Sequence, residues 1–170
     1  MPIVPESQRV EMLRRWGISA PLIRLACGDV LHELFRLHYG RPPWHIYRSV
    51  EPPAGPPLAA LWEWSSQIVG VWRGDNGLEF IRFSFEAPKE YRILAHTEQG
   101  FWITQFDFLY EIDAPLADLR AAARAVEFQF VEEYLAARQT AERTLGTFEA
   151  HERWLRALVA SIDGSPTTSS

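Results

Sequence analysis

The segment from Leu58 to Leu94 constrains the fold more than any other part of the chain, because it has the pattern of short antiparallel strands. Gln67 to Trp72 is rich in β-branched and aromatic residues, which favour strands. Asp75-Asn76-Gly77 follows, and Asn-Gly is a strong hairpin signal because both residues tolerate positive φ. The sequence therefore predicts a mainly antiparallel sheet over about residues 58–95.

The strand that returns from this turn has an interrupted alternation of apolar residues. Leu78 and Phe80 share one face, whereas Ile81, Phe83 and Phe85 share the other. Two interpretations are open. Either a β-bulge lies near Phe80, or the strand is central and both of its faces are covered.

Helical patterns flank the predicted sheet on both sides in the sequence. Apolar residues recur at helical spacing over about 7–16, and a second stripe begins after Ser19, a good N-cap, and continues to Leu37. Dense apolar coverage over 101–112 favours a buried helix, with a strand as the alternative. Asp113 and Thr147 are expected to cap further helices, the last of which ends at Gly164. We predict a single α+β domain over residues 1–164, with N-terminal and C-terminal helices packed on the sheet, and a disordered tail over 165–170.

A proline-rich segment over 41–57 separates the first helices from the strands. Its six prolines exclude a helix and a central strand. It is either a linker or a long ordered loop. The ordered loop is favoured, because Trp44, Ile46 and Tyr47 would be costly to leave in water.

Composition and charge exclude several classes of function. The net charge of −5 argues against a nucleic-acid-binding protein, which usually presents a basic surface to phosphates. Cys27 is the only cysteine, so an internal disulfide and a cysteine-based zinc site are excluded, and its apolar neighbours favour a buried thiol. No stretch approaches the roughly 20 apolar residues that span a bilayer, and the first residues lack the pattern of a signal peptide. We therefore expect a cytoplasmic protein that binds neither nucleic acid nor membranes.

No arrangement of residues predicts catalysis. His151-Glu152 lacks the second histidine of a metalloprotease helix, and the chain has neither a Gly-x-Ser-x-Gly elbow nor a phosphate-binding glycine loop. Asp107 stands between two phenylalanines, which the solvent side of a helix would explain. We therefore expect no catalytic residues, no metal site, no cofactor and no enzymatic activity.

The feature that stands out is aromatic: the chain has seven Trp, ten Phe and five Tyr. Aromatic side chains dominate both cores and protein interfaces. Glu63 lies between Trp62 and Trp64 and would contact a partner's arginine or act as an acid. The candidate partner-binding residues are Trp44, Glu63, Trp64, Trp72, Asp75 and Tyr91.

The segment over 61–111 resembles the SUKH superfamily, which includes a yeast cell-wall synthesis regulator and many bacterial immunity proteins. The resemblance is carried by Leu-Trp-Glu-Trp at 61–64, Ile-Val-Gly-Val-Trp at 68–72, Gly-Leu-Glu-Phe-Ile-Arg-Phe-Ser-Phe-Glu at 77–86, Leu-Ala-His-Thr-Glu-Gln-Gly-Phe at 94–101 and Phe-Leu-Tyr-Glu at 108–111. The N-terminal part lacks the Leu-Pro then Asn-Gly entry that many members show. The resemblance implies helices against one face of a mainly antiparallel sheet, and a bacterial immunity protein that neutralises a toxin, with no catalytic residues to carry over.

Three hypotheses for the function follow, and the sequence sets no oligomeric state. The first is a protein-binding module, an immunity protein whose partner is a basic toxin or effector. The second is a small-molecule-binding protein or hydrolytic enzyme with a pocket under the aromatic sheet, using Glu63 or His96 as acid or base. The third is an accessory subunit of a phage or secretion assembly that docks through the last two helices. A deep cavity with convergent polar groups would favour the second, and a solidly filled region would exclude it.

Overall fold

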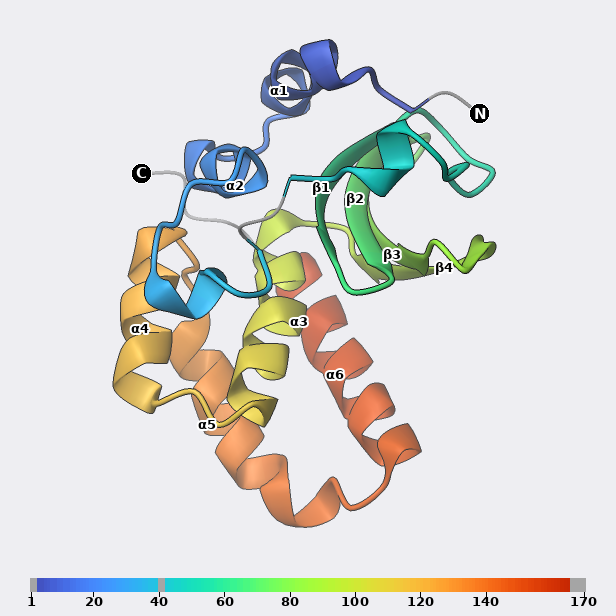
Figure 1. Ribbon diagram of the computed structural model, residues 1–170. Helices are drawn as coiled ribbons and strands as arrows, with labels where there is room; N and C mark the ends of the chain where they lie inside the picture. Colours follow the sequence, from blue (N-terminus) through green and yellow to red (C-terminus); the bar gives the residue numbers. More distant parts are fainter. Residues whose placement is uncertain (1–2, 40–41, 166–170) are drawn as a thin grey trace.

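The computed structural model describes residues 3–39 and 42–165 and has an α+β fold (Figure 1). Four antiparallel strands form one sheet in the order β1-β2-β3-β4. The strands are β1 (Leu58–Trp64), β2 (Gln67–Gly74), β3 (Gly77–Ser84) and β4 (Ala87–Ala95). The predicted antiparallel sheet and its position in the chain are therefore confirmed.

The register of the sheet resolves the interrupted alternation in β3. β2 and β3 pair without a break from Gln67↔Ser84 to Gly74↔Gly77, and the turn between them is the predicted hairpin. The pairing of β3 with β4 shifts between Phe80 and Ile81. Both of these residues are buried, on opposite faces. The strand is therefore covered on both sides, which explains the interrupted alternation, and the β-bulge near Phe80 has its extra residue, Leu94, in β4.

The C-terminal helices are α3 (Glu98–Glu111), α4 (Leu116–Ala125), α5 (Val131–Ala141), the short 3₁₀ helix η3 (Glu142–Thr144) and α6 (Phe148–Asp163). Two of them, α3 and α6, pack on one face of the sheet, and α4 and α5 lie beyond α3 (Figure 1). α3 packs against β4, α4 and α6, which explains its dense apolar coverage, and the expected helix over 101–112 is confirmed (Figure 1). Thr147 caps α6 as predicted, by accepting the backbone N–H of Ala150. Among the described residues, no helix is long and apolar enough to cross a membrane.

The N-terminal helices differ from the prediction in one respect. α1 (Glu6–Arg15) and α2 (Ala20–Ala26) begin where expected, and Ser19 caps α2. The prediction that the apolar stripe continues as helix to Leu37 was wrong. Gly28 adopts a φ of +95° and ends α2, and only the 3₁₀ helix η1 (Glu33–Phe35) follows. Cys27 at this turn is exposed and not buried.

Asp113 does not cap α4 in the way the sequence indicates. The helix begins after Pro115, which occupies the cap position. Asp113 instead adopts a φ of 61° in the turn that follows α3. Asparagine and aspartate tolerate this left-handed conformation better than most residues, so Asp113 serves the turn rather than the helix.

The proline-rich segment forms an ordered layer over the other face of the sheet. Within residues 42–57, the 3₁₀ helix η2 (His45–Tyr47) places Ile46 in a second core with Leu58, Ile68 and Trp72. The ordered loop is therefore the correct alternative, and both faces of the sheet are covered. Residue 41 of this segment and residues 166–170 of the expected tail lie outside the described residues.

Candidate functional site: a cavity between the sheet and α6

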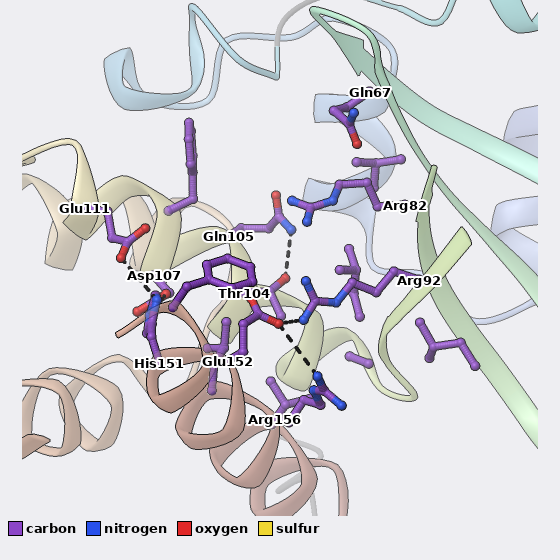
Figure 2. Close-up of a pocket in the computed structure, with 18 of the residues that line it drawn as sticks. Gln67, Arg82, Arg92, Thr104, Gln105, Asp107, Glu111, His151, Glu152 and Arg156 are labelled. Atoms are coloured by element: carbon purple, nitrogen blue, oxygen red, sulfur yellow. Dashed lines mark hydrogen bonds and ion pairs between the residues drawn. The ribbon is translucent and has the colours of Figure 1, made fainter. Parts of the chain in front are cut away.

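A cavity of about 990 Å³ lies between the α3-facing side of the sheet and the helices α3 and α6 (Figure 2). All four strands contribute to its wall. Trp62 and Val69 are buried in this wall, and Leu155 extends it from α6. The cavity has the size and the mixture of apolar and polar groups that ligand sites commonly show.

Two arginines project from the sheet into the cavity. Arg82 of β3 and Arg92 of β4 stand directly opposite each other in the register, on the same face as Val69. Figure 2 shows both side chains extending from the strands toward Thr104 and Gln105 of α3. Like charges in directly opposite positions destabilise a strand pair unless an anion lies between them.

One carboxylate partly balances this positive charge. Glu152 of α6 forms an ion pair with Arg92 and lies 4.0 Å from the guanidinium of Arg156. Desolvation lowers the pKa of Arg92, and the charges of Arg82 and Arg156 lower it further. Desolvation also lowers the pKa of Arg82. This corner of the cavity therefore holds more positive than negative charge.

A second polar cluster lies on the other side of the cavity and centres on Asp107, which is 2% exposed. Asp107 accepts hydrogen bonds from the Tyr134 hydroxyl at 3.1 Å and from His151 Nε2 at 2.8 Å. Its carboxylate also pairs with Arg138 Nε at 3.3 Å. His151 Nδ1 lies 3.3 Å from Glu111 Oε1, so the imidazole bridges two carboxylates.

The residues Asp107, Glu111 and His151 could hold a metal ion, since one ligand atom from each lies within 4.8 Å of the others. The guanidinium of Arg138 already occupies the space beside both carboxylates. It also stacks on the rings of Tyr110 and Trp154, at 4.9 and 5.7 Å from their centroids. Because the Arg138 guanidinium is held on several sides and already supplies the positive charge, these residues are better explained as a structural cluster that joins α3, α5 and α6 than as a metal site.

Three rings pack together beside the cavity. His38 lies edge-on to Trp64 and to Phe108, with centroids 4.6 and 5.0 Å apart, and Trp64 and Phe108 are 5.4 Å apart. Burial lowers the pKa of His38, and its Nδ1 has no hydrogen-bond partner among the described residues. Trp64 is 40% exposed, so an aromatic surface borders the open part of the cavity.

The structure separates the candidate partner-binding residues. Trp72 is 1% exposed, and its indole N–H donates to Glu79. Glu63 is 7% exposed and accepts the backbone N–H of Ile46, and one of its oxygens lies 2.9 Å from His45 Nδ1. Burial gives these two side chains structural roles and leaves no surface through which they could contact a partner.

The other four partner-binding candidates are exposed but do not form one surface. They are Trp44, Trp64, Asp75 and Tyr91. Trp64 borders the cavity on the α3-facing side of the sheet. Tyr91 packs against Trp72 on the opposite side, and Asp75 lies in the hairpin turn. A binding role for these four residues stays a prediction.

The proposed acid–base residues are also separated. His96 lines the cavity, whereas Glu63 faces η2 on the other side of the sheet. They therefore cannot act on one bound molecule in this cavity.

No protein-family model, curated protein or solved structure matches the chain. The resemblance to the SUKH superfamily therefore stays a prediction, and the function is argued below from the geometry of the cavity.

Sequence reasoning missed the polar residues of the cavity. The expectation that Asp107 faces solvent was wrong, because the side chain is buried by α5 and α6. Strand alternation from Phe80 would have placed Arg82 on the inner face, which was an available signal. The partners from α6, His151 and Glu152, carry no local signal that joins them to residues so far away in the chain.

Proposed function

We propose that the protein is a small-molecule-binding domain whose ligand occupies the cavity between the sheet and α6. The observation that carries this proposal is the cavity itself, at about 990 Å³, in a chain whose core is otherwise tightly packed with rings. Well-packed interiors rarely leave such space without a use.

The distribution of groups around the cavity supports binding. Its wall is apolar over Trp62, Val69 and Leu155, and the polar side chains of Gln67 and Gln105 also line it. Pockets of this kind use apolar walls for affinity and a few polar groups for orientation.

The titratable side chains on the α3 and α6 wall are engaged with one another, which favours binding over turnover by these groups. His151 faces Asp107 and Glu111, and Glu152 faces Arg92. A general acid or base must present a free lone pair or proton to its substrate.

A cavity-filling variant tests the proposal. Ala160 of α6 lines the cavity and is exposed, so a tryptophan there projects into the free space with no displacement of the core. The probe is N-phenyl-1-naphthylamine, a neutral aromatic amine whose fluorescence rises in apolar surroundings. We expect saturable binding to the native protein and at least tenfold weaker binding to Ala160→Trp.

The matched control is Ala157→Trp, which adds the same ring to an exposed position of α6 outside the cavity. This variant should bind the probe as the native protein does. Equal binding by the native protein and Ala160→Trp would place the probe elsewhere and contradict the proposal, as would no binding at all.

A second candidate function is the binding of a protein partner, an immunity protein and its toxin being the case that the SUKH resemblance implies. The exposure of Trp44 and Tyr91, at 53% and 43%, favours it, because exposed rings anchor many interfaces. Co-purification from the native host should recover one basic protein with the native chain and lose it with Trp44→Ala or Tyr91→Ala. Recovery that does not depend on either ring would contradict this candidate.

A further inference from the structure

The charges around the cavity indicate the chemistry of its ligand. Each of the four carboxylates that line the cavity is held by a donor on another element. Asp107 and Glu111 face Arg138 and His151. Asp163 accepts the backbone N–H groups of His96 and Thr97, both at 2.9 Å, and Glu152 is shared by Arg92 and Arg156.

Arg82 is the exception among the charged side chains that line the cavity. Within residues 3–39 and 42–165, no hydrogen bond or ion pair engages its guanidinium. The charge of Arg82 lowers the pKa of Arg92, which stands opposite it in the register, and Glu152 pairs with Arg92 and Arg156. The Arg82 side chain is exposed to the open cavity, and its planar fork of donors suits an oxyanion.

We infer that the ligand carries a negatively charged oxyanion, a carboxylate or a phosphate, which Arg82 binds inside the cavity. This inference rests on the proposed function, since it assigns the ligand class of the same cavity. The anion relieves the repulsion between Arg82 and Arg92 across β3 and β4. Gln67 and Gln105 line the cavity and offer neutral donors to the same group.

The rest of the ligand is apolar. Trp64 and Phe108 present a ring surface beside the cavity, and Trp62 and Leu155 extend the apolar wall. A flat ring or a chain packs against such a surface, with the oxyanion directed at the sheet. The ligand class is therefore an amphipathic organic anion.

Two probes that differ only in the charged group test this inference. N-Phenyl-1-naphthylamine is neutral, and 8-anilinonaphthalene-1-sulfonate has the same ring system with a sulfonate added. We expect the native protein to bind the sulfonate about tenfold more tightly than the amine, the difference that one charge-assisted hydrogen bond makes. Arg82→Gln should lose about tenfold in affinity for the sulfonate and keep its affinity for the amine. Added salt should weaken the sulfonate alone.

Arg73→Gln is the matched control, because Arg73 is exposed on β2 and does not line the cavity. It should bind both probes as the native protein does. Folding is checked by urea denaturation without ligand, in which Arg82→Gln should be at least as stable as the native protein, since it removes a repulsion between directly opposite charges.

The outcomes separate the two proposals. If the native protein binds neither probe, both the proposed function and this inference are wrong. If the amine binds and Arg82→Gln binds the sulfonate as tightly as the native protein does, the cavity is a ligand site but the anion assignment is wrong.

Displacement of bound 8-anilinonaphthalene-1-sulfonate tests whether the oxyanion of the ligand is a phosphate or a carboxylate. 1-Naphthyl phosphate and 1-naphthoate share a ring system and differ in the oxyanion. Stronger displacement by one of them assigns a phosphate or a carboxylate, and both results support the inference. Equal displacement by uncharged 1-naphthol overturns it.

Discussion

Removal of the Asp107 carboxylate should be among the most destabilising single changes in this protein. The side chain is 2% exposed and contacts Tyr134, His151 and Arg138, which belong to α5 and α6. In Asp107→Ala, the carboxylate that Arg138 keeps among the described residues is Glu111, at 3.7 Å, although the Arg138 side chain is only 11% exposed. Breaking a buried ion pair by removing one partner costs about 3–5 kcal/mol. We therefore expect a loss of that size.

The measurement is urea denaturation followed by circular dichroism and by tryptophan fluorescence. With a slope of about 2 kcal/mol per molar urea, the midpoint should fall by about 2 M. Glu132→Ala is the control, because it breaks an ion pair with Arg120 in which both side chains are largely exposed, and its midpoint should hardly change. A midpoint for Asp107→Ala equal to that of Glu132→Ala would refute the reasoning.

A double variant distinguishes a structural cluster from a general loss of packing. Asp107→Leu combined with Arg138→Met replaces both charges with apolar groups of similar size. The loss should be clearly smaller than the sum of the two single losses, because no buried charge is left without a partner. Additive losses would mean that the ion pair is not the source of the stability.

Two further predictions concern the fold. Gly55→Ala should destabilise the protein by about 1–3 kcal/mol, because a Cβ there would lie 2.6 Å from Cζ3 of the buried Trp72, whereas Gly74→Ala, with nothing within 4 Å, should be tolerated in the same urea assay. Burial raises the pKa of Glu98 although hydrogen bonds from Ser19 oppose the shift. Because the pKa of Glu98 is higher in the folded state than in the unfolded state, protonated Glu98 favours the folded state. This contribution to stability is complete at a pH below the pKa of the unfolded state, and it is lost as the pH rises through the pKa of the folded state. The urea midpoint of the native protein should thus fall relative to that of Glu98→Gln as the pH rises above the ordinary glutamate pKa of about 4.3, and a constant difference would contradict this assignment.

The parts of the fold that could be predicted are those with local causes. The hairpin lies where Asn-Gly predicts it, with Asp75 and Asn76 between the paired Gly74 and Gly77, but only Gly77 adopts a positive φ, of +120°. Ser19 and Thr147 cap helices because their side chains accept backbone N–H groups of the first turn. The prediction failed at Gly28, where apolar residues continue at helical spacing but the backbone turns. The spacing of apolar residues shows which residues can be buried, but it does not show where a helix ends. A single glycine at positive φ can end the helix within such a pattern.

The cavity could be predicted only in part, because its residues acquire their roles from partners that are distant in the sequence. Alternation along β3 places Arg82 on the inner face, but its position opposite Arg92 depends on a β-bulge at Leu94 of β4, which the sequence did not determine. Two arginines directly opposite each other in a sheet break the usual rule for cross-strand pairs, and natural proteins keep such violations mainly where function needs them. Hydrophobic patterns determine that a sheet and a helix layer pack together here. The guanidinium of Arg82, which has no anionic partner between these layers, indicates the class of ligand that the cavity binds.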